Sequence, residues 1–216
     1  MTARSTITPP VRSTYRHGDL HRALLEAGIE LARQGGPEAV VLREATRRAG
    51  VAPNAAYRHF ASREALLQAV RAASLQAVAA AMEAELATLP RKLSPADFAR
   101  ASVRAVGTGY LRFALAETGL FRTAFAASDK LLQGTPELST AGASGLNPFE
   151  LLGAALDKLV EAGVMPAKRR PGAEFLAWSA VHGLAMLVVD GPLRNVIGPQ
   201  MQQVGQRLLD MVEKGL

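Results

Sequence analysis

Residues 42–60 read LREATRRAGVAPNAAYRHF, and this stretch decides the fold. Apolar residues stand at helical spacing over residues 42–49, and Gly50 follows where a left-handed residue usually ends a helix. Val51 supplies an apolar side chain in the turn, and Pro53 suits the first position of a second helix, predicted over residues 53–60. The pattern predicts two short helices joined by a glycine-containing turn, a helix-turn-helix unit.

Helical spacing also dominates the rest of the chain, and no segment alternates as a half-buried strand does. We predict a helix over residues 19–34, stopped by Gly-Gly-Pro, and a long helix after Ser62, a good N-cap. Further helices are expected over residues 95–115, 121–125, 148–162, 171–190 and 200–211, with a loop rich in Gly, Ser, Thr and Pro at 133–146. The expected fold is all-α, with a three-helix helix-turn-helix domain, a C-terminal helical bundle and about nine helices.

Composition narrows the class of protein. The 216 residues are 49% hydrophobic, enough for a core, and cysteine is absent, so we expect neither a disulfide nor a thiolate metal site, no metal and no cofactor. Residues 1–16 are polar and lack the apolar region of a secretory signal. The longest apolar run, residues 175–189, is too short for a membrane helix. We therefore expect a cytoplasmic protein with no membrane partner.

Charge is concentrated near the N-terminus. Residues 1–71 carry 11 of the 25 Lys+Arg and 6 of the 19 Asp+Glu, so they hold nearly all of the net charge of +6. The plain interpretation is a solubilising surface. The concentration in one third of the chain favours a module that binds a polyanion.

The flanks of the first stretch make it more specific. With GGPEAVV before it and ASREALLQAV after it, residues 19–70 resemble the DNA-binding domain of tetracycline repressor (TetR) family regulators. Tyr-x-His-Phe at 57–60 followed by Ser-Arg-Glu-x-Leu-Leu at 62–67 is the decisive part. AWSAVHGLA, at 177–185, resembles the Trp-His-Gly (WHG) signature found in the C-terminal domains of one subgroup.

The resemblance implies a DNA-binding transcriptional regulator, a repressor that binds a palindromic operator on double-stranded DNA as a homodimer and is released by a small-molecule effector. It also implies a basic N-terminal arm at residues 1–16, a DNA-binding domain at 17–64, and a ligand-binding and dimerisation domain at 65–216.

Candidate DNA contacts fall into three groups. The first positions of a helix that enters the major groove must be small or polar. The resemblance assigns phosphate contacts to an aromatic residue, a histidine and an arginine. Basic residues near these positions form the third group. The predicted set is Pro53, Asn54, Ala55, Tyr57, His59, Arg63, Arg43, Arg58, Arg12 and Arg16. The alternatives are that Tyr57 packs the small domain and that His59 is a helix-end histidine facing solvent.

Three positions depart from the family's usual pattern. Val41 and Ala52 replace the usual helix N-caps, and each lost cap costs about 1 kcal/mol. Thr46 stands where a buried alanine is usual, so its hydroxyl must bond a backbone carbonyl or be exposed.

The C-terminal part is expected to enclose a cavity for a largely apolar effector, because few charged residues fall on the inferred inner faces. The candidate ligand-binding residues are Tyr110, Phe113, Phe121, Phe125, Phe149, Leu152, Leu156, Trp178, His182 and Met186. The alternative for each is plain core, and for His182 a structural hydrogen bond.

Residues 174–189 are apolar almost all round, so that helix needs cover on two sides. We expect the face with Trp178 and His182 to pack inside its own domain and the adjacent face to meet a partner subunit. The predicted dimer interface is Ala177, Val181, Leu184, Val188, Val204, Leu208 and Met211.

Other classes of function remain as alternatives. The sequence has no Gly-rich phosphate loop, nucleophile elbow or paired metal-binding histidines, so we do not expect an enzyme. An architectural DNA-binding protein without an effector, and an interaction module that has lost DNA binding, are the other two candidates.

Overall fold

The computed structural model describes residues 17–126, 139–194, 196 and 200–216. Within these residues it has nine α-helices and two short 3-10 helices, and no strand, so the all-α prediction is confirmed. The helices are α1 (His17–Gly35), η1 (Pro37–Ala39), α2 (Leu42–Arg48), α3 (Pro53–Ala56), α4 (Arg63–Ala87), α5 (Pro95–Ala116), α6 (Thr118–Phe125), α7 (Pro148–Glu161), η2 (Ala167–Arg169), α8 (Ala173–Val189) and α9 (Met201–Gly215).

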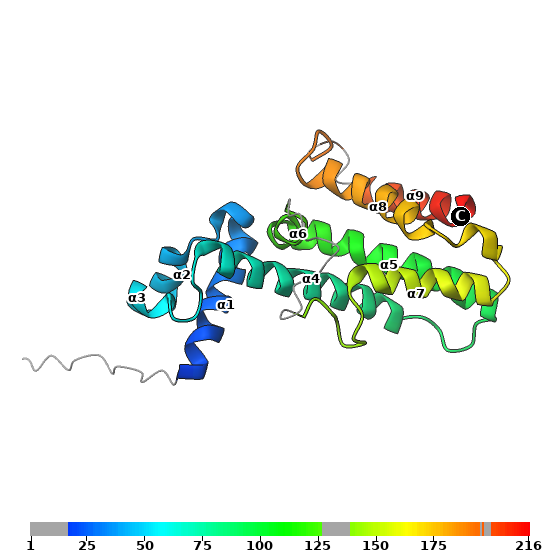
Figure 1. Cartoon of the computed structure of the whole chain (residues 1–216). Helices are drawn as coiled ribbons and strands as arrows, with labels where there is room; N and C mark the ends of the chain where they lie inside the picture. The colour runs from blue at the N-terminus through cyan, green and yellow to red at the C-terminus, as the bar shows by residue number, and fades with distance from the viewer. Residues whose placement is uncertain (1–16, 127–138, 195, 197–199) are drawn as a thin grey trace, which may run out of the picture.

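The helices form a small unit and a bundle that share one element. Figure 1 shows α1, α2 and α3 together at one end, and α4 leading from them into the bundle. Inside the bundle, α5 contacts α4, α7, α8 and α9, while α6 contacts both α1 and α4. The two ends of the molecule are therefore joined through α4 and α6.

One contact between α4 and α5 is unusually close. A Cβ on Gly109 of α5 would lie 2.6 Å from the carbonyl oxygen of Ala81 and 2.7 Å from the Cα of Met82, both on α4. Only glycine lets the two backbones approach this far. The packing of α4 on α5 therefore depends on this position.

Local signals set the helix starts as predicted. The Ser62 side chain accepts the Ala65 amide at 3.1 Å, and Asn147 and Glu150 form a reciprocal capping box at the start of α7. Gly50 adopts a positive φ of 68° at the end of α2. These are short-range contacts that the sequence pattern already specifies.

The departures noted at α2 and α3 are also seen. Neither Val41 nor Ala52 makes a side-chain cap hydrogen bond. Thr46 is buried, and its hydroxyl donates to the Arg43 carbonyl at 2.7 Å, as its polarity requires. The predicted helix over residues 53–60 is regular only to Ala56 and continues as a turn.

Length and composition alone would let α4 cross a membrane, a point that the sequence analysis missed. However, 50% of its apolar window is buried inside the protein. A core helix of a bundle passes the same test, so this is weak evidence for a membrane span.

Substituting Gly109→Ala should separate α4 from α5 and lower the free energy of unfolding by about 1–3 kcal/mol, the usual cost of overpacking. Gly153→Ala is the matched control, because the nearest atom to its new Cβ, in Arg170, lies at an ordinary 3.6 Å. That variant should gain about 0.5–1 kcal/mol from helix propensity. Urea unfolding measures both, and equal effects would contradict the close-packing argument.

Candidate DNA-binding surface and ligand cavity

The corner of α3 projects from the body of the molecule. The Tyr57 side chain is 58% exposed, and Asn54 and Arg58 are exposed beside it. Phe60 points the other way and is only 4% exposed, so it packs inside the small unit. The alternative that Tyr57 packs the small domain is therefore wrong, and the corner is available to a partner.

His59 is half-buried between this corner and α1. The ring of His21, on α1, stacks on Phe60 with centroids 4.6 Å apart and meets the ring of His59 edge-on at 6.2 Å. The sequence analysis did not single out His21, which belongs to no motif. The two histidines and Phe60 together hold the end of residues 53–60 against α1.

The arginines of the helix-turn-helix unit differ in their partners. The side chains of Arg43 and Arg58 are exposed and make no hydrogen bond or ion pair with any residue that the structure describes. Arg47 bonds Glu44 through two nitrogens at 2.8 and 2.7 Å, and these hydrogen bonds lower the pKa of Glu44 to about 2. Arg43 and Arg58 are the cations left available for an anionic partner.

Arg63 has a structural role that the sequence analysis missed. Its Nε donates to the Val40 carbonyl and a terminal nitrogen donates to the Pro37 carbonyl, both at 2.8 Å. The side chain thereby fastens the start of α4 to η1 and to the entry of α2. The phosphate contact implied by the resemblance would have to use its remaining donors.

Three of the predicted DNA contacts cannot be placed. Arg12 and Arg16 lie outside the described residues, and so does the side chain of Pro53. Ala55 is partly exposed on the same helix as Asn54.

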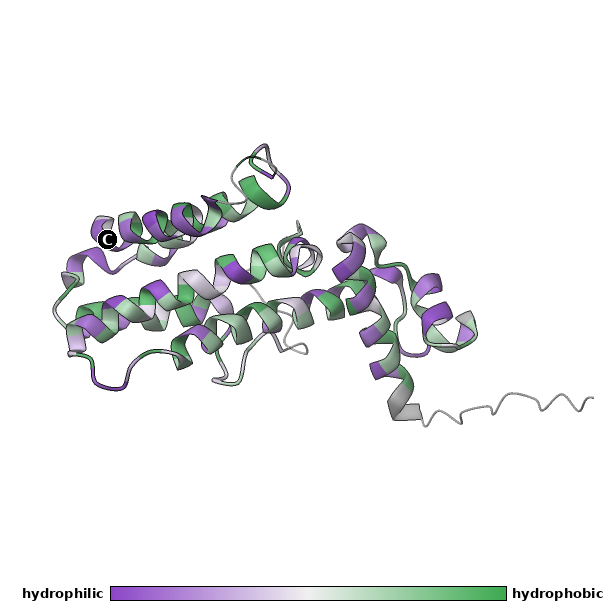
Figure 2. Ribbon diagram, turned by 180° about the vertical axis from the view of Figure 1, so that it is seen from behind, coloured by the Kyte–Doolittle hydropathy of each residue, from purple (hydrophilic) through white to green (hydrophobic). Residues whose placement is uncertain are grey.

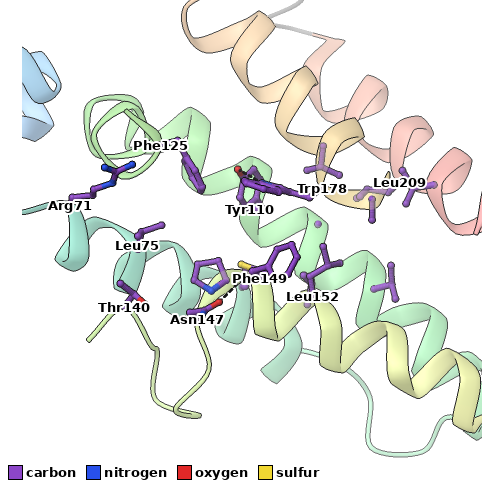
Figure 3. A pocket seen from close by; sticks show the side chains of 18 of the residues that line it. Arg71, Leu75, Tyr110, Phe125, Thr140, Asn147, Phe149, Leu152, Trp178 and Leu209 are labelled. Carbon is purple, nitrogen blue, oxygen red and sulfur yellow. Dashed lines mark hydrogen bonds between the residues drawn. The ribbon is translucent and has the colours of Figure 1, made fainter. Parts of the chain in front are cut away.

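A cavity of about 170 Å³ lies inside the bundle. The cavity is lined by residues of α4, α5, α6, α7, α8 and α9 (Figure 3). Thr140 and Asn147, from the loop before α7, also line it. That loop is held to α4 by Glu83, whose carboxylate accepts the amides of Ala143 and Ser144 at 2.9 and 2.8 Å. Hydrogen bonds from Ser144 lower the pKa of Glu83.

Half of the ten predicted ligand-binding residues line this cavity: Tyr110, Phe125, Phe149, Leu152 and Trp178. The lining does not include Phe113, Phe121, Leu156, His182 and Met186, which corrects the prediction. Phe121 and Leu156 are 0% exposed because they fill the spaces between helices. Helical spacing tells which residues share a face, and it does not tell where the core leaves a void.

The sequence analysis missed most of the remaining lining: Gln68, Arg71, Ala72, Leu75, Met82, Val103, Val106, Gly107, Pro148, Leu209 and Val212. One signal was present in the sequence. Arg71 is the only charged residue between Glu64 and Glu83, and a lone charge in a largely apolar helix often marks a site.

Trp178, Tyr110 and His182 form a hydrogen-bonded chain beside the cavity. Trp178 Nε1 donates to the Tyr110 hydroxyl at 3.3 Å, and the hydroxyl forms a second hydrogen bond with His182 Nδ1 at 2.7 Å. The tautomer of His182 sets the direction of this second bond, and the hydroxyl donates when the ring is neutral with its proton on Nε2. Burial lowers the pKa of His182, which agrees, and the structural alternative for this histidine holds.

Comparison with known proteins decides the family. Residues 24–70 match the profile "Bacterial regulatory proteins, tetR family", and residues 103–212 match "Tetracyclin repressor-like, C-terminal domain". The chain belongs to the TetR family. It is therefore a DNA-binding transcriptional regulator by family, and these matches point away from an enzyme.

Solved structures share the TetR fold over almost the whole chain. A Rhodococcus sp. RHA1 protein of unknown function is 24% identical with a TM-score of 0.72, covering 95% of this chain and 99% of that one. FadR from Bacillus subtilis, in complex with stearoyl-CoA, is 14% identical with a TM-score of 0.66, covering 91% and 99%. TetR-Q116A from Acinetobacter baumannii, in complex with minocycline, is 18% identical with a TM-score of 0.55, covering 89% and 93%. No curated protein matches the chain.

The predicted dimer interface of this TetR-family protein needs correction on α8. Ala177, Val181, Leu184 and Val188 are at most 9% exposed within a single chain, so they offer little surface to a partner subunit. The first two line the cavity instead. The sequence analysis identified a two-faced helix correctly and placed the wrong face outside.

The exposed apolar residues of α8 lie one position away. Leu176 is 68% and Leu187 is 44% exposed, and a Cβ on Gly183 between them would meet no atom within 4 Å. On α9, which alternates hydrophobic and hydrophilic residues in Figure 2, Met211 is 60% exposed and Val204 and Leu208 are half-buried. These residues give each of the two helices, which contact each other, exposed apolar side chains, and we call them together the apolar stripe of α8 and α9.

No group of three or more His, Asp or Glu side chains that would suit a metal ion occurs in the part of the chain that the structure describes.

Acidification should weaken the folded state through His182. Burial lowers the pKa of His182 from 6.5, so the unfolded chain binds a proton at this histidine more readily than the folded protein does. The contribution of neutral His182 to the free energy of unfolding is therefore complete above pH 6.5, and it is lost as the pH falls through the lower pKa of the folded protein. Urea unfolding should show that the free energy of unfolding of the wild type decreases between about pH 7.5 and about pH 5.5. The decrease should be smaller in His182→Gln, whose amide keeps an acceptor for Tyr110. Equal decreases in both proteins would refute this role.

Proposed function

We propose that this protein is a repressor that binds a palindromic operator as a homodimer and releases it when a small molecule enters the bundle cavity. One observation carries the proposal: a projecting, unpaired cationic corner and an internal cavity are joined by the continuous helix α4. The predicted domain boundary at residues 64 and 65 falls in the first turn of α4, so this helix belongs to both regions. Such a regulator acts in the cytoplasm, where it meets chromosomal DNA.

The exposed corner would supply both kinds of DNA contact. Arg43, Arg58 and Tyr57 are exposed donors suited to phosphate oxygens, which set the register of the protein on the duplex. Asn54 and Ala55 at the start of α3 suit base edges in the major groove. His59 and Arg63, which are engaged within the protein, would act mainly by positioning this corner.

The apolar stripe on α8 and α9 would form the dimer interface. Leu176, Ala180, Gly183 and Leu187 lie on one side of α8, at the spacing of successive turns. The small residues in the middle would let a second copy approach closely, and Met211 would extend the contact. A twofold dimer places its recognition helices about 34 Å apart, which gives a palindromic site.

Coupling between cavity and DNA would run through α4 and α6. The backbone of α6 lies directly on the end of α1, where a Cβ on Gly119 would be 2.2 Å from the Ala32 carbonyl oxygen. Arg33 of α1 also pairs with Glu117 at 2.8 Å, just before α6. A ligand that binds one arrangement of these helices more tightly would change the spacing of the two recognition segments.

The family supports the general scheme. TetR regulators bind DNA, act as dimers and bind small-molecule ligands. FadR of Bacillus subtilis and TetR-Q116A of Acinetobacter baumannii were solved with stearoyl-CoA and minocycline, two chemically unlike molecules. The identity of the effector therefore has to come from this chain's own cavity.

A selection from random DNA duplexes at fixed salt tests the operator. We expect a symmetric consensus, and Arg43→Ala or Arg58→Ala should weaken binding to all sites alike, since each removes one phosphate contact per subunit. In a dimer the slope of log affinity against log salt should fall in magnitude by about 2. Fluorescence anisotropy with labelled duplexes measures both effects.

Arg91→Ala is the matched control, an exposed arginine in the connection between α4 and α5, far from α3. It should leave affinity and salt slope unchanged. Recovery of no consensus, with a steep salt slope, would instead indicate an architectural DNA-binding protein. Indifference to every duplex at low salt would indicate an interaction module.

Leu176→Glu should convert the dimer to a monomer, because it places a charge in an apolar part of the proposed contact on each copy. Phe98→Glu is the control, since Phe98 is 38% exposed but lies beside Lys158 and Glu161 of α7, away from the stripe. Sedimentation velocity at micromolar concentration distinguishes the two states. A wild-type monomer, or a dimer that survives Leu176→Glu, would show that the stripe is not the interface.

A further inference from the structure

The cavity contains one buried cation. Arg71, on α4, is 7% exposed, and no other Lys, Arg or His is among the residues that line the cavity. Its Nε donates to the Ala124 carbonyl at 3.2 Å, and a terminal nitrogen donates to the Ala126 carbonyl. Within the described residues no carboxylate forms an ion pair with it, and burial lowers its pKa.

The two carbonyl contacts do not account for a buried charge. A guanidinium has about five N–H donors, and two carbonyls use only part of them. Neutral donors would hold the end of α6 without the cost of removing a charge from water. A buried cation whose charge is unpaired and whose donors are partly unused is therefore suited to an anion that comes from outside.

The rest of the cavity is apolar and elongated. Figure 3 shows Arg71, Thr140 and Asn147 toward one end and Leu209 at the other, with aromatic side chains between them. Along α4 alone the lining extends from Gln68, one turn before Arg71, to Met82, which corresponds to about 21 Å of helix. A molecule that fills this space has one polar end and a long apolar body.

The number of cations limits the charge of the polar end. One guanidinium neutralises one negative charge, and its planar fork matches the two oxygens of a carboxylate. A doubly charged phosphate would leave one charge uncompensated among apolar side chains.

We propose that the effector is an amphipathic carboxylate whose head pairs with Arg71 and whose apolar body extends toward Leu209. This deepens the proposed function, because it rests on the cavity being the effector site, and it adds one anionic end to the expected, largely apolar effector. A carboxylate that binds the unused donors of Arg71 draws the guanidinium into the cavity and weakens its hydrogen bonds to the Ala124 and Ala126 carbonyls. Binding therefore loosens the attachment of α6, which packs on α1, and carries the signal toward the DNA-binding unit.

Trp178 gives a direct readout, since it is the only tryptophan of the chain and lines the cavity. Titrations of the full-length protein should follow its fluorescence with two matched pairs, octanoate against octanol and phenylbutanoate against phenylbutanol. Each carboxylate should bind about tenfold or more tightly than its alcohol, as expected for a desolvated charge pair. Adding the carboxylate should also release the selected operator duplex.

Arg71→Gln removes the charge and keeps N–H donors for the α6 carbonyls, so its preference for the carboxylate should disappear. Arg71→Lys keeps the charge without the planar guanidinium group, so it should retain part of the preference for the carboxylate. Arg91→Gln is the control, an exposed arginine outside the cavity, and should behave as the wild type.

The outcomes separate this proposal from the proposed function. Equal affinity of the wild-type protein for acid and alcohol would overturn the carboxylate proposal and leave an effector cavity in place, even if Arg71→Gln did not fold. A preserved preference in Arg71→Gln would overturn the role of Arg71. A lack of any response by Trp178 would overturn both the proposal and the cavity as effector site, while operator selection would still test the DNA-binding function independently.

Discussion

The rest of the structure depends on α4 being one continuous helix fastened at both of its ends. Near its start, Arg63 ties it to the carbonyls of Pro37 and Val40, and further along its backbone touches α5 at Gly109. A helix moves as a rigid rod over such a length because each turn is hydrogen bonded to the next. In the proposed function, α4 is therefore the element that would transmit a displacement at the cavity to the helix-turn-helix unit.

The arginines of this protein differ in whether their charge is paired with an acid. The arginines near α2 and α3 divide into those held by acids or carbonyls, such as Arg47 and Arg63, and those left exposed, Arg43 and Arg58. Inside the bundle, Trp178, Tyr110 and His182 satisfy one another, whereas Arg71 forms no direct ion pair among the described residues and only the more distant charge of Glu64 acts on it. The same chemical criterion, a cation without an acid, identifies the outer surface and the inner site.

Sequence reasoning succeeded where the determining contacts are local. Ser62, Asn147 and Gly50 act on residues within one turn, so their roles as caps and turn are visible in the pattern. It failed on α8, where Ala177 and Val181 were assigned to a partner subunit and in fact face the cavity. The two apolar faces of that helix are chemically alike, so composition does not distinguish inside from outside.

By itself the sequence determined the all-α class, the helix-turn-helix unit and the family, because these follow from short-range spacing and a distinctive motif. Only the tertiary structure decided that Tyr57 projects, which half of the ten candidate ligand-binding residues surround a void, which stripe of α8 is exposed, and that Arg71 is buried without an ion pair among the described residues. The physical reason is that helical periodicity defines the faces of each helix, whereas the neighbour of each face depends on how distant helices pack together.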